Sequence, residues 1–144
     1  MSKIHEFRLR VIPPFENPMP FLPAKIKNDE TLRSFLISTR IQVTCIPASW
    51  AAELGFTTRK IKAFNVDPVF NVEAESVAWI RISFYDESGL NCLGNSEIET
   101  FVSRDLNGAY GILGSNEVFH ELSVFRICGD KFEFKMRTPE SSHS

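Results

Sequence analysis

The clearest strand in the sequence is residues 77–85, which read Val-Ala-Trp-Ile-Arg-Ile-Ser-Phe-Tyr. Apolar residues alternate there with larger or polar ones: Ala78, Ile80, Ile82 and Phe84 against Trp79, Arg81, Ser83 and Tyr85. Successive side chains of a strand point to opposite faces, so this alternation predicts a half-buried β-strand. An Asp-Glu-Ser-Gly turn at 86–89 ends it.

A hairpin is predicted nearer the C-terminal end, where residues 124–128 and 131–136 flank Gly129-Asp130. A two-residue connection containing glycine is typical of the primed turns that join antiparallel strands. Counting outward from this turn places Ile127 opposite Phe132 and Phe125 opposite Phe134. The same register sets Arg126 opposite Glu133, a cross-strand pair of opposite charge.

Weaker sequence patterns predict further strands and a few helical segments. Strands are predicted at 4–12, 38–46, 57–66 and 97–102, and helical segments at 47–55, 116–121 and from Asp29-Glu30. Five prolines at 13–23 predict an extended arm that lies across a surface, and residues 107–115 form a glycine-rich loop. Without β-α-β alternation, these elements predict a mainly β fold, a β-sandwich or open barrel with one or two short helices.

The composition predicts one domain over residues 1–137, followed by a polar tail at 138–144. Thirteen phenylalanines among 144 residues indicate a core packed from rings without hydroxyl groups. The net charge of −2 is unevenly spread: residues 1–62 carry a balance of +5 and residues 63–144 a balance of −7. A surface divided into a positive and a negative side would favour self-association or docking on phosphate. The alternative is that the two halves interleave and their charges mix.

The three cysteines, Cys45, Cys92 and Cys128, form no Cys-x-x-Cys pair and leave an odd thiol under any pairing. No secretory segment is visible, and no apolar run approaches the roughly 20 residues of a membrane span. A cytoplasmic, reducing location is therefore expected.

No signature of catalysis stands out in the sequence, so an enzymatic role is left open but not favoured. Cys92 with His120 is a conceivable nucleophile and base, although nothing in the sequence brings them together. Glu73 with Glu75, and Glu97 with Glu99, have the spacing of ordinary solvated strand faces. The histidines share no metal-binding spacing, and the glycines at 108, 111 and 114 do not form a phosphate-binding loop. No catalytic residue, metal or cofactor is predicted.

Basic residues are the remaining candidates for a binding site: Lys25, Lys27, Arg59, Lys60 and Lys62. Such residues could hold the phosphates of RNA or of an anionic lipid surface. In a regular strand Arg59 points away from Lys60 and Lys62. The alternative is a solvated strand edge on which lysines discourage aggregation.

Several stretches resemble the small matrix proteins of bornavirus-like non-segmented negative-strand RNA viruses. The similar stretches are residues 46–68, Val72-Glu73, residues 79–84, Phe119, residues 123–126 and Cys128-Gly129. The resemblance implies a β-sandwich protomer that forms homo-oligomers, lies under the viral envelope on anionic lipid, and binds RNA or nucleocapsid. The chain departs from such proteins in its slightly acidic charge and in lacking a Pro-Pro-x-Tyr motif.

Two functional hypotheses follow from the sequence. The first is a non-catalytic, matrix-like assembly protein in the cytoplasm or virion, docking its basic N-terminal half on anionic membrane or RNA. The alternative is a small β-barrel that binds or isomerises an apolar small molecule in a phenylalanine-lined cavity.

Overall fold

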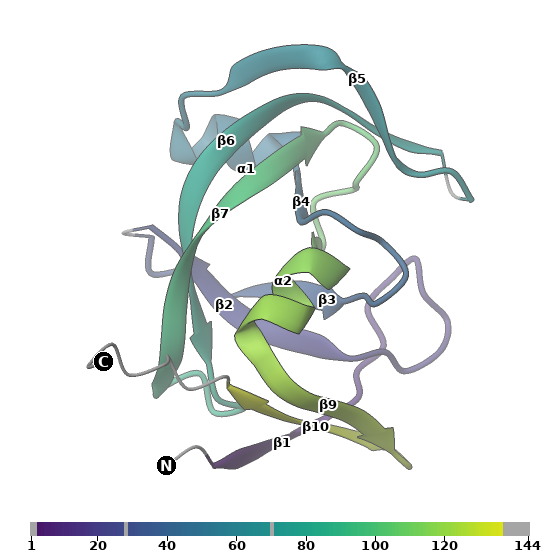
Figure 1. Cartoon of the computed structure of the whole chain (residues 1–144), viewed down its shortest axis with the longest axis vertical. Helices are drawn as coiled ribbons and strands as arrows, with labels where there is room; N and C mark the ends of the chain where they lie inside the picture. Colours follow the sequence, from purple (N-terminus) through teal and green to yellow (C-terminus); the bar gives the residue numbers. More distant parts are fainter. Residues whose placement is uncertain (1–2, 28, 70, 137–144) are drawn as a thin grey trace.

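The computed structural model describes residues 3–27, 29–69 and 71–136. Ten strands and two short helices follow one another along these residues (Figure 1): β1 (Ile4–Arg8), β2 (Phe21–Ile26), β3 (Arg33–Ile37), β4 (Cys45–Pro47), α1 (Ala48–Leu54), β5 (Arg59–Asp67), β6 (Val72–Tyr85), β7 (Cys92–Ser103), β8 (Gly111–Leu113), α2 (Ser115–Glu121), β9 (Leu122–Cys128) and β10 (Lys131–Met136). The predicted mainly β fold with few short helices is confirmed. The predicted tail lies outside the described residues, and the single domain over 1–137 stays a prediction.

The larger sheet closes into a barrel. Its strand order is β2-β3-β8-β4-β7-β6, and a further pairing of β2 with β6 joins the two ends of this ring. β5 pairs with the outer side of β6 and forms a long hairpin with it. A second, three-stranded sheet of order β1-β10-β9 lies below the barrel in Figure 1.

Several barrel strands are buried on both faces. In β3, Phe35 and Ile37 belong to one apolar cluster, whereas Leu36 between them belongs to another. The same division holds in β4, where Cys45 and Ile46 lie in different clusters. Strands covered on both sides have continuous apolar sequences rather than alternating ones. Both faces of these strands must therefore be covered, one by the barrel interior and the other by a separate element.

The first cluster fills the space between the barrel and the small sheet. Phenylalanine rings dominate it: Phe7 stacks on Phe132 and Phe134, with ring centroids 5.1 and 5.3 Å apart. The predicted hairpin register is confirmed, since Phe132 opposes Ile127 and Phe134 opposes Phe125. Arg126 and Glu133 form the expected cross-strand ion pair.

The second cluster lies beneath the β5–β6 hairpin and is called here the tip cluster. Its buried members come from the barrel, the hairpin and the loop after β7: Phe21, Leu36, Ile41, Cys45, Val66, Val72, Ala74, Leu106, Tyr110 and Ile112. The proline-rich arm covers its margin, because Phe15 and Met19 pack against it. The predicted cover for the apolar residues of this arm is thus found.

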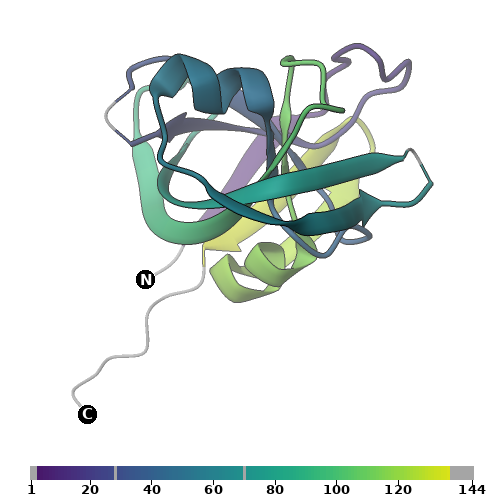
Figure 2. The same cartoon turned by 90° about the horizontal axis from the view of Figure 1, so that it is seen from above.

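The two helices lie on opposite sides of the long β5 and β6 strands when the molecule is seen from above (Figure 2). The prediction of a helix at 47–55 is confirmed, with Pro47 as its N-cap and Gly55 in the left-handed conformation at its end. The predicted helical segment at 116–121 is confirmed as α2.

The predicted strand at 38–46 is wrong over most of its length, because residues 38–44 form a loop between β3 and β4. The β-branched residues that suggested a strand have other partners. Thr44 is fully buried, donates to Glu117 and accepts the amide of Gly114. Ile41 is buried in the tip cluster.

Four smaller predictions also differ from the structure. Asp29 and Glu30 open no helix and instead pair with Arg33 and Lys25. The strand predicted from residue 4 ends at Arg8, and the arm predicted to Pro23 ends where β2 begins at Phe21. The glycine-rich loop contains β8, which local signals missed because it is only three residues long and is stabilised between β3 and β4.

Ion pairs bring charges of the two halves of the chain together. Arg40 of the first half pairs with Asp67 of the second, and Arg59 likewise pairs with Glu99. These contacts agree with the interleaved alternative, and a division of the whole surface into a positive and a negative side stays a prediction.

Gly114 provides a test of this packing, since a methyl group added there would lie 2.3 Å from the backbone carbon of Val43. Gly114→Ala should lower the free energy of unfolding by about 3 kcal/mol or more, because backbone must move. Gly55→Ala is the matched control: its added methyl meets nothing within 4 Å, so only the cost of a φ of +68° remains, about 1 kcal/mol. Urea unfolding measures both variants, and equal losses would contradict the packing described.

Candidate functional site

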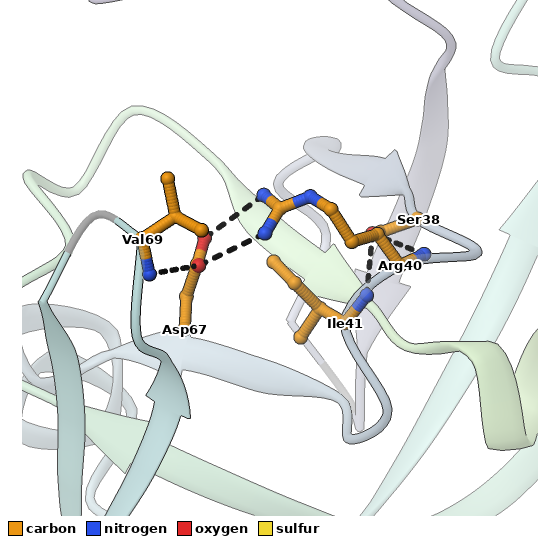
Figure 3. A network of polar contacts seen from close by, with 5 residues as sticks. All are labelled: Ser38, Arg40, Ile41, Asp67 and Val69. Carbon is orange, nitrogen blue, oxygen red and sulfur yellow. Dashed lines mark hydrogen bonds and ion pairs between the residues drawn. The ribbon is translucent and has the colours of Figure 1, made fainter.

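The loop of residues 38–44 follows β3 and is called here the floor loop. The hydroxyl of Ser38 turns the chain at its start by accepting the backbone amides of Arg40 and Ile41, at 3.3 and 3.0 Å. Side-chain oxygens of serine commonly stabilise such turns. The turn directs the side chain of Arg40 towards the hairpin (Figure 3).

An ion pair joins the tip of the β5–β6 hairpin to the floor loop. Both guanidinium nitrogens of Arg40 donate to the two carboxylate oxygens of Asp67, each at 3.0 Å (Figure 3). Asp67 also accepts the amide of Val69, at 3.1 Å. We call Arg40 and Asp67 the latch pair. Figure 1 shows the hairpin arching over the barrel towards the loop that joins β3 to β4.

Burial of the latch pair is unequal. The side chain of Asp67 is 3% exposed, whereas that of Arg40 is 54% exposed. The hydrogen bonds to Asp67 raise the pKa of the Arg40 guanidinium. Burying a charged carboxylate costs free energy unless a partner compensates its charge. Arg40 therefore stabilises the buried, charged form of Asp67.

Beside the latch pair, the hairpin is also tied to the end of β7. The backbone amide of Glu73 donates to Asp105 at 2.8 Å, and the hydroxyl of Ser103 donates to the carbonyl of Glu73 at 2.6 Å. A cavity of about 390 Å³ lies next to these contacts, lined in part by Lys60 and Arg104. The tip of the hairpin, the floor loop and residues 104–110 together enclose the tip cluster. This arrangement is a packed apolar cluster with a polar latch at its edge.

A buried thiol lies inside the tip cluster. Cys45 is fully buried in the tip cluster, and burial raises the pKa of its thiol to about 12. Cys92 and Cys128 are exposed. Burial also raises the pKa of Tyr110, with a further contribution from Asp67.

The predicted basic residues do not form one patch. Lys25 pairs with Glu30 and lies 4.8 Å from the ring of Tyr85, while Lys27 lies 4.9 Å from the ring of Phe56. Both come from the β2 side of the barrel, where residue 25 pairs with residue 83 of β6.

The other three predicted basic residues lie on β5, where Arg59 pairs with residue 77 of β6 and Lys60 with residue 76. The two groups are thus six residues apart along β6, about 20 Å at the usual rise of a strand. Arg59 pairs with Glu99, Lys60 lines the cavity and Lys62 is exposed.

Cys92 and His120, considered from the sequence as a nucleophile and its base, contact other groups. The thiol of Cys92 donates a hydrogen bond to the carbonyl of Gly94, and the ring of His120 contacts Glu121. Within residues 3–27, 29–69 and 71–136, no three His, Cys, Asp or Glu side chains are grouped to hold a metal ion. No helix in this described part of the chain is long and apolar enough to cross a bilayer.

Sequence reasoning missed the latch pair altogether. Arg40 and Asp67 are 27 positions apart, and no local pattern joins them. The available signal was an apolar run at residues 35–37 followed at once by polar residues, a sign of a strand that ends at a functional loop.

Comparison with solved structures identifies the fold. The chain is similar to a retropepsin-like aspartic protease from Rickettsia conorii, with 16% identity, a TM-score of 0.61 and 94% of each chain covered. It is also similar to the retroviral protease-like domain of Ddi1 from Leishmania major, with 14% identity, a TM-score of 0.52, and 86% of this chain and 97% of that one covered. No protein-family model and no curated protein matches the sequence.

These similarities correct the functional reading of the sequence. The fold is retropepsin-like, so the resemblance to bornavirus-like matrix proteins is wrong. The matrix-like assembly role and the small-molecule barrel are not supported either. Membrane and RNA partners are not supported by these comparisons. A lipid- or nucleic-acid-binding role for Lys25, Lys27, Arg59, Lys60 and Lys62 stays a prediction.

The buried thiol reports on the latch pair. In the native protein at pH 8, an aromatic disulfide reagent should label Cys92 and Cys128 quickly and Cys45 slowly. Arg40→Ala should speed the labelling of Cys45 roughly thirtyfold, because losing one partner of a partly exposed ion pair costs about 2 kcal/mol. Absorbance of the released thiolate gives the rates. Arg81→Ala, which removes the exposed pair with Glu97, is the control, and an equal effect there would contradict a specific latch.

Proposed function

We propose that this chain binds an extended segment of polypeptide between the β5–β6 hairpin and the floor loop, in a cleft that opens when the hairpin lifts from the tip cluster. The single observation that carries the proposal is the position of the hairpin, whose residues Val66, Val72 and Ala74 close an apolar cluster on the barrel. A similar fold occurs in one protein named a protease and in another named a protease-like domain.

The surroundings of the cleft suit a polypeptide better than a compact small molecule. β5 is the last strand of its sheet, so the backbone groups along its outer edge have no strand partner in the described pairing. Extended peptides bind by adding to such edges, with their side chains in alternate pockets. Leu106 and Tyr110 are apolar surfaces that such side chains would meet once the hairpin lifts.

Hydrolysis by an aspartate pair is a separate step with its own requirement. Aspartic proteases use two carboxylates about 3 Å apart that share one proton. The floor loop, Ser-Thr-Arg-Ile-Gln-Val-Thr, contains no carboxylate. The buried aspartate that faces it, Asp67, gives both oxygens to Arg40. These contacts support recognition of polypeptide and do not support its hydrolysis by this mechanism.

The proposal includes a homodimer, the form in which retropepsin-like proteases typically function. An edge is present for it: among the described residues β9 pairs only with β10, and Ile127 on β9 is 54% exposed. Exposed apolar edge strands readily pair with another chain. Antiparallel pairing of β9 with its copy would join the two small sheets across a two-fold axis.

Polypeptide binding can be tested with fluorescein-labelled casein, an unfolded protein. Anisotropy should rise to saturation with added protein, and casein should slow amide hydrogen exchange in residues 38–44 and 104–110 but not in the turn at 86–91. Leu106→Glu should weaken binding at least tenfold by placing a charge in the cleft. Leu90→Glu is the control, since Leu90 is 83% exposed in that distant turn.

The same mixtures decide the chemistry. Mass spectrometry from pH 3 to pH 8 should find casein intact, and fragments that grow with time would show that the chain hydrolyses peptide bonds. Protection spread evenly over the protein, or confined to the turn at 86–91, would contradict binding in the cleft.

The dimer can be tested by sedimentation velocity. Ile127→Lys should convert dimers to monomers at equal protein concentration, because it places a charge at the centre of the new sheet. Leu90→Lys, an equally drastic change at an exposed residue elsewhere, should leave the dimer intact. A wild-type protein that stays monomeric at 0.1 mM would overturn this part of the proposal.

A further inference from the structure

Arg40 has the geometry of a carboxylate-binding residue. Its two terminal nitrogens each donate at 3.0 Å to a different oxygen of one carboxylate. The planar fork of a guanidinium matches a carboxylate in this way, whereas an ammonium group does not. Arg40 remains 54% exposed although its partner is almost fully buried.

The carboxylate bound by Arg40 comes from a different part of the molecule. Arg40 belongs to the floor loop, on the body of the barrel, whereas Asp67 is the last residue of β5 at the tip of the hairpin. β5 has a strand neighbour on one side only, and its pairing with β6 is irregular between Lys60 and Phe64. The hairpin tip is therefore held to the floor loop chiefly by the latch pair and by the apolar contacts of Val66 and Val72.

We propose that Arg40 is a carboxylate-binding subsite of the cleft, occupied by Asp67 in the closed form and by an acidic side chain of the bound polypeptide when the hairpin lifts. This inference rests on the proposed binding of polypeptide and adds the class of ligand. Val66-Asp67 shows the pattern that fits: one acidic residue next to an apolar residue that enters the tip cluster.

Charge balance explains why an acidic segment is selected. When an acidic side chain replaces Asp67, Arg40 exchanges one carboxylate for another and remains paired. A neutral or basic segment would leave the guanidinium facing an uncharged or like-charged group. Specificity of this kind arises from the penalty on the wrong ligand as much as from attraction to the right one.

A small carboxylate tests the subsite by itself. In Asp67→Ala, 50 mM formate should raise the melting temperature by about 2 °C or more relative to chloride at the same ionic strength, by binding where the side chain was removed. The wild type and the double variant Arg40→Gln/Asp67→Ala should show no such rise. If Asp67→Ala does not fold, Asp67→Ser serves instead, because its short side chain keeps a polar group there and still leaves room for formate beside Arg40.

Two labelled peptides test the polypeptide. One copies residues 62–69, Lys-Ala-Phe-Asn-Val-Asp-Pro-Val, and the other has asparagine in place of its aspartate. Asp67→Ala should bind the acidic peptide at least tenfold more tightly than the amide peptide, and more tightly than the wild type binds it. Arg40→Gln/Asp67→Ala should lose this preference. The control adds Arg81→Gln/Glu97→Ala to the Asp67→Ala variant, which removes an exposed ion pair at 3.2 Å on β6 and β7. It should change neither the effect of formate nor the preference for the acidic peptide.

The two arms separate the two ideas. A formate effect that survives the loss of Arg40 overturns the subsite. Equal binding of both peptides overturns the acidic preference and leaves polypeptide binding standing. A formate effect that depends on Arg40, with no peptide bound by any variant, keeps the carboxylate subsite and overturns the polypeptide proposal.

Discussion

The constraint on which this structure depends is that β2, β3, β4 and β8 have apolar side chains on both faces. A closed barrel can cover one face of its strands with its own interior, and the other face needs a separate cover. In this chain the proline-rich arm and the β5–β6 hairpin supply it, through Phe15, Met19, Val66 and Val72. The hairpin is thus part of the hydrophobic core as well as the roof of a cleft.

The double role of the hairpin explains the chemistry of its tip. A roof held only by apolar contacts would need to be large, but Val66, Val72 and Ala74 are small or medium side chains. The ion pair between Arg40 and Asp67 adds a directional contact at the point furthest from the base of the hairpin. Loss of the ion pair would destabilise the fold mainly because the carboxylate of Asp67 would then be buried without a partner, which is strongly disfavoured.

The sequence predicted local features well and distant ones poorly. The β9–β10 register could be derived because turn, apolar pattern and the charges of Arg126 and Glu133 all agree within a few residues. The strand faces of residues 77–85 could be read from alternation, and they match the buried and exposed positions. The floor loop was misread as a strand because β-branched residues such as Thr44 and Ile41 were recruited for tertiary contacts. The site itself could not be found, since its two charged residues meet only after the barrel has closed.

The closure of the barrel and of the small sheet has a consequence for how the molecule acquires its fold. Lys25 of β2 pairs with Ser83 of β6, and Ile4 of β1 pairs with Lys135 of β10, so each sheet is completed by segments very far apart along the chain. Such pairing requires a long loop to close, and the entropy of that closure is lost before any stabilising contact forms. Proteins with this kind of topology fold slowly, on the millisecond to second scale. During synthesis Phe7 of β1 stays uncovered until β10, its strand neighbour, has left the ribosome. Transiently exposed apolar strands are prone to aggregate, so β1 is at greater risk than the locally paired hairpins.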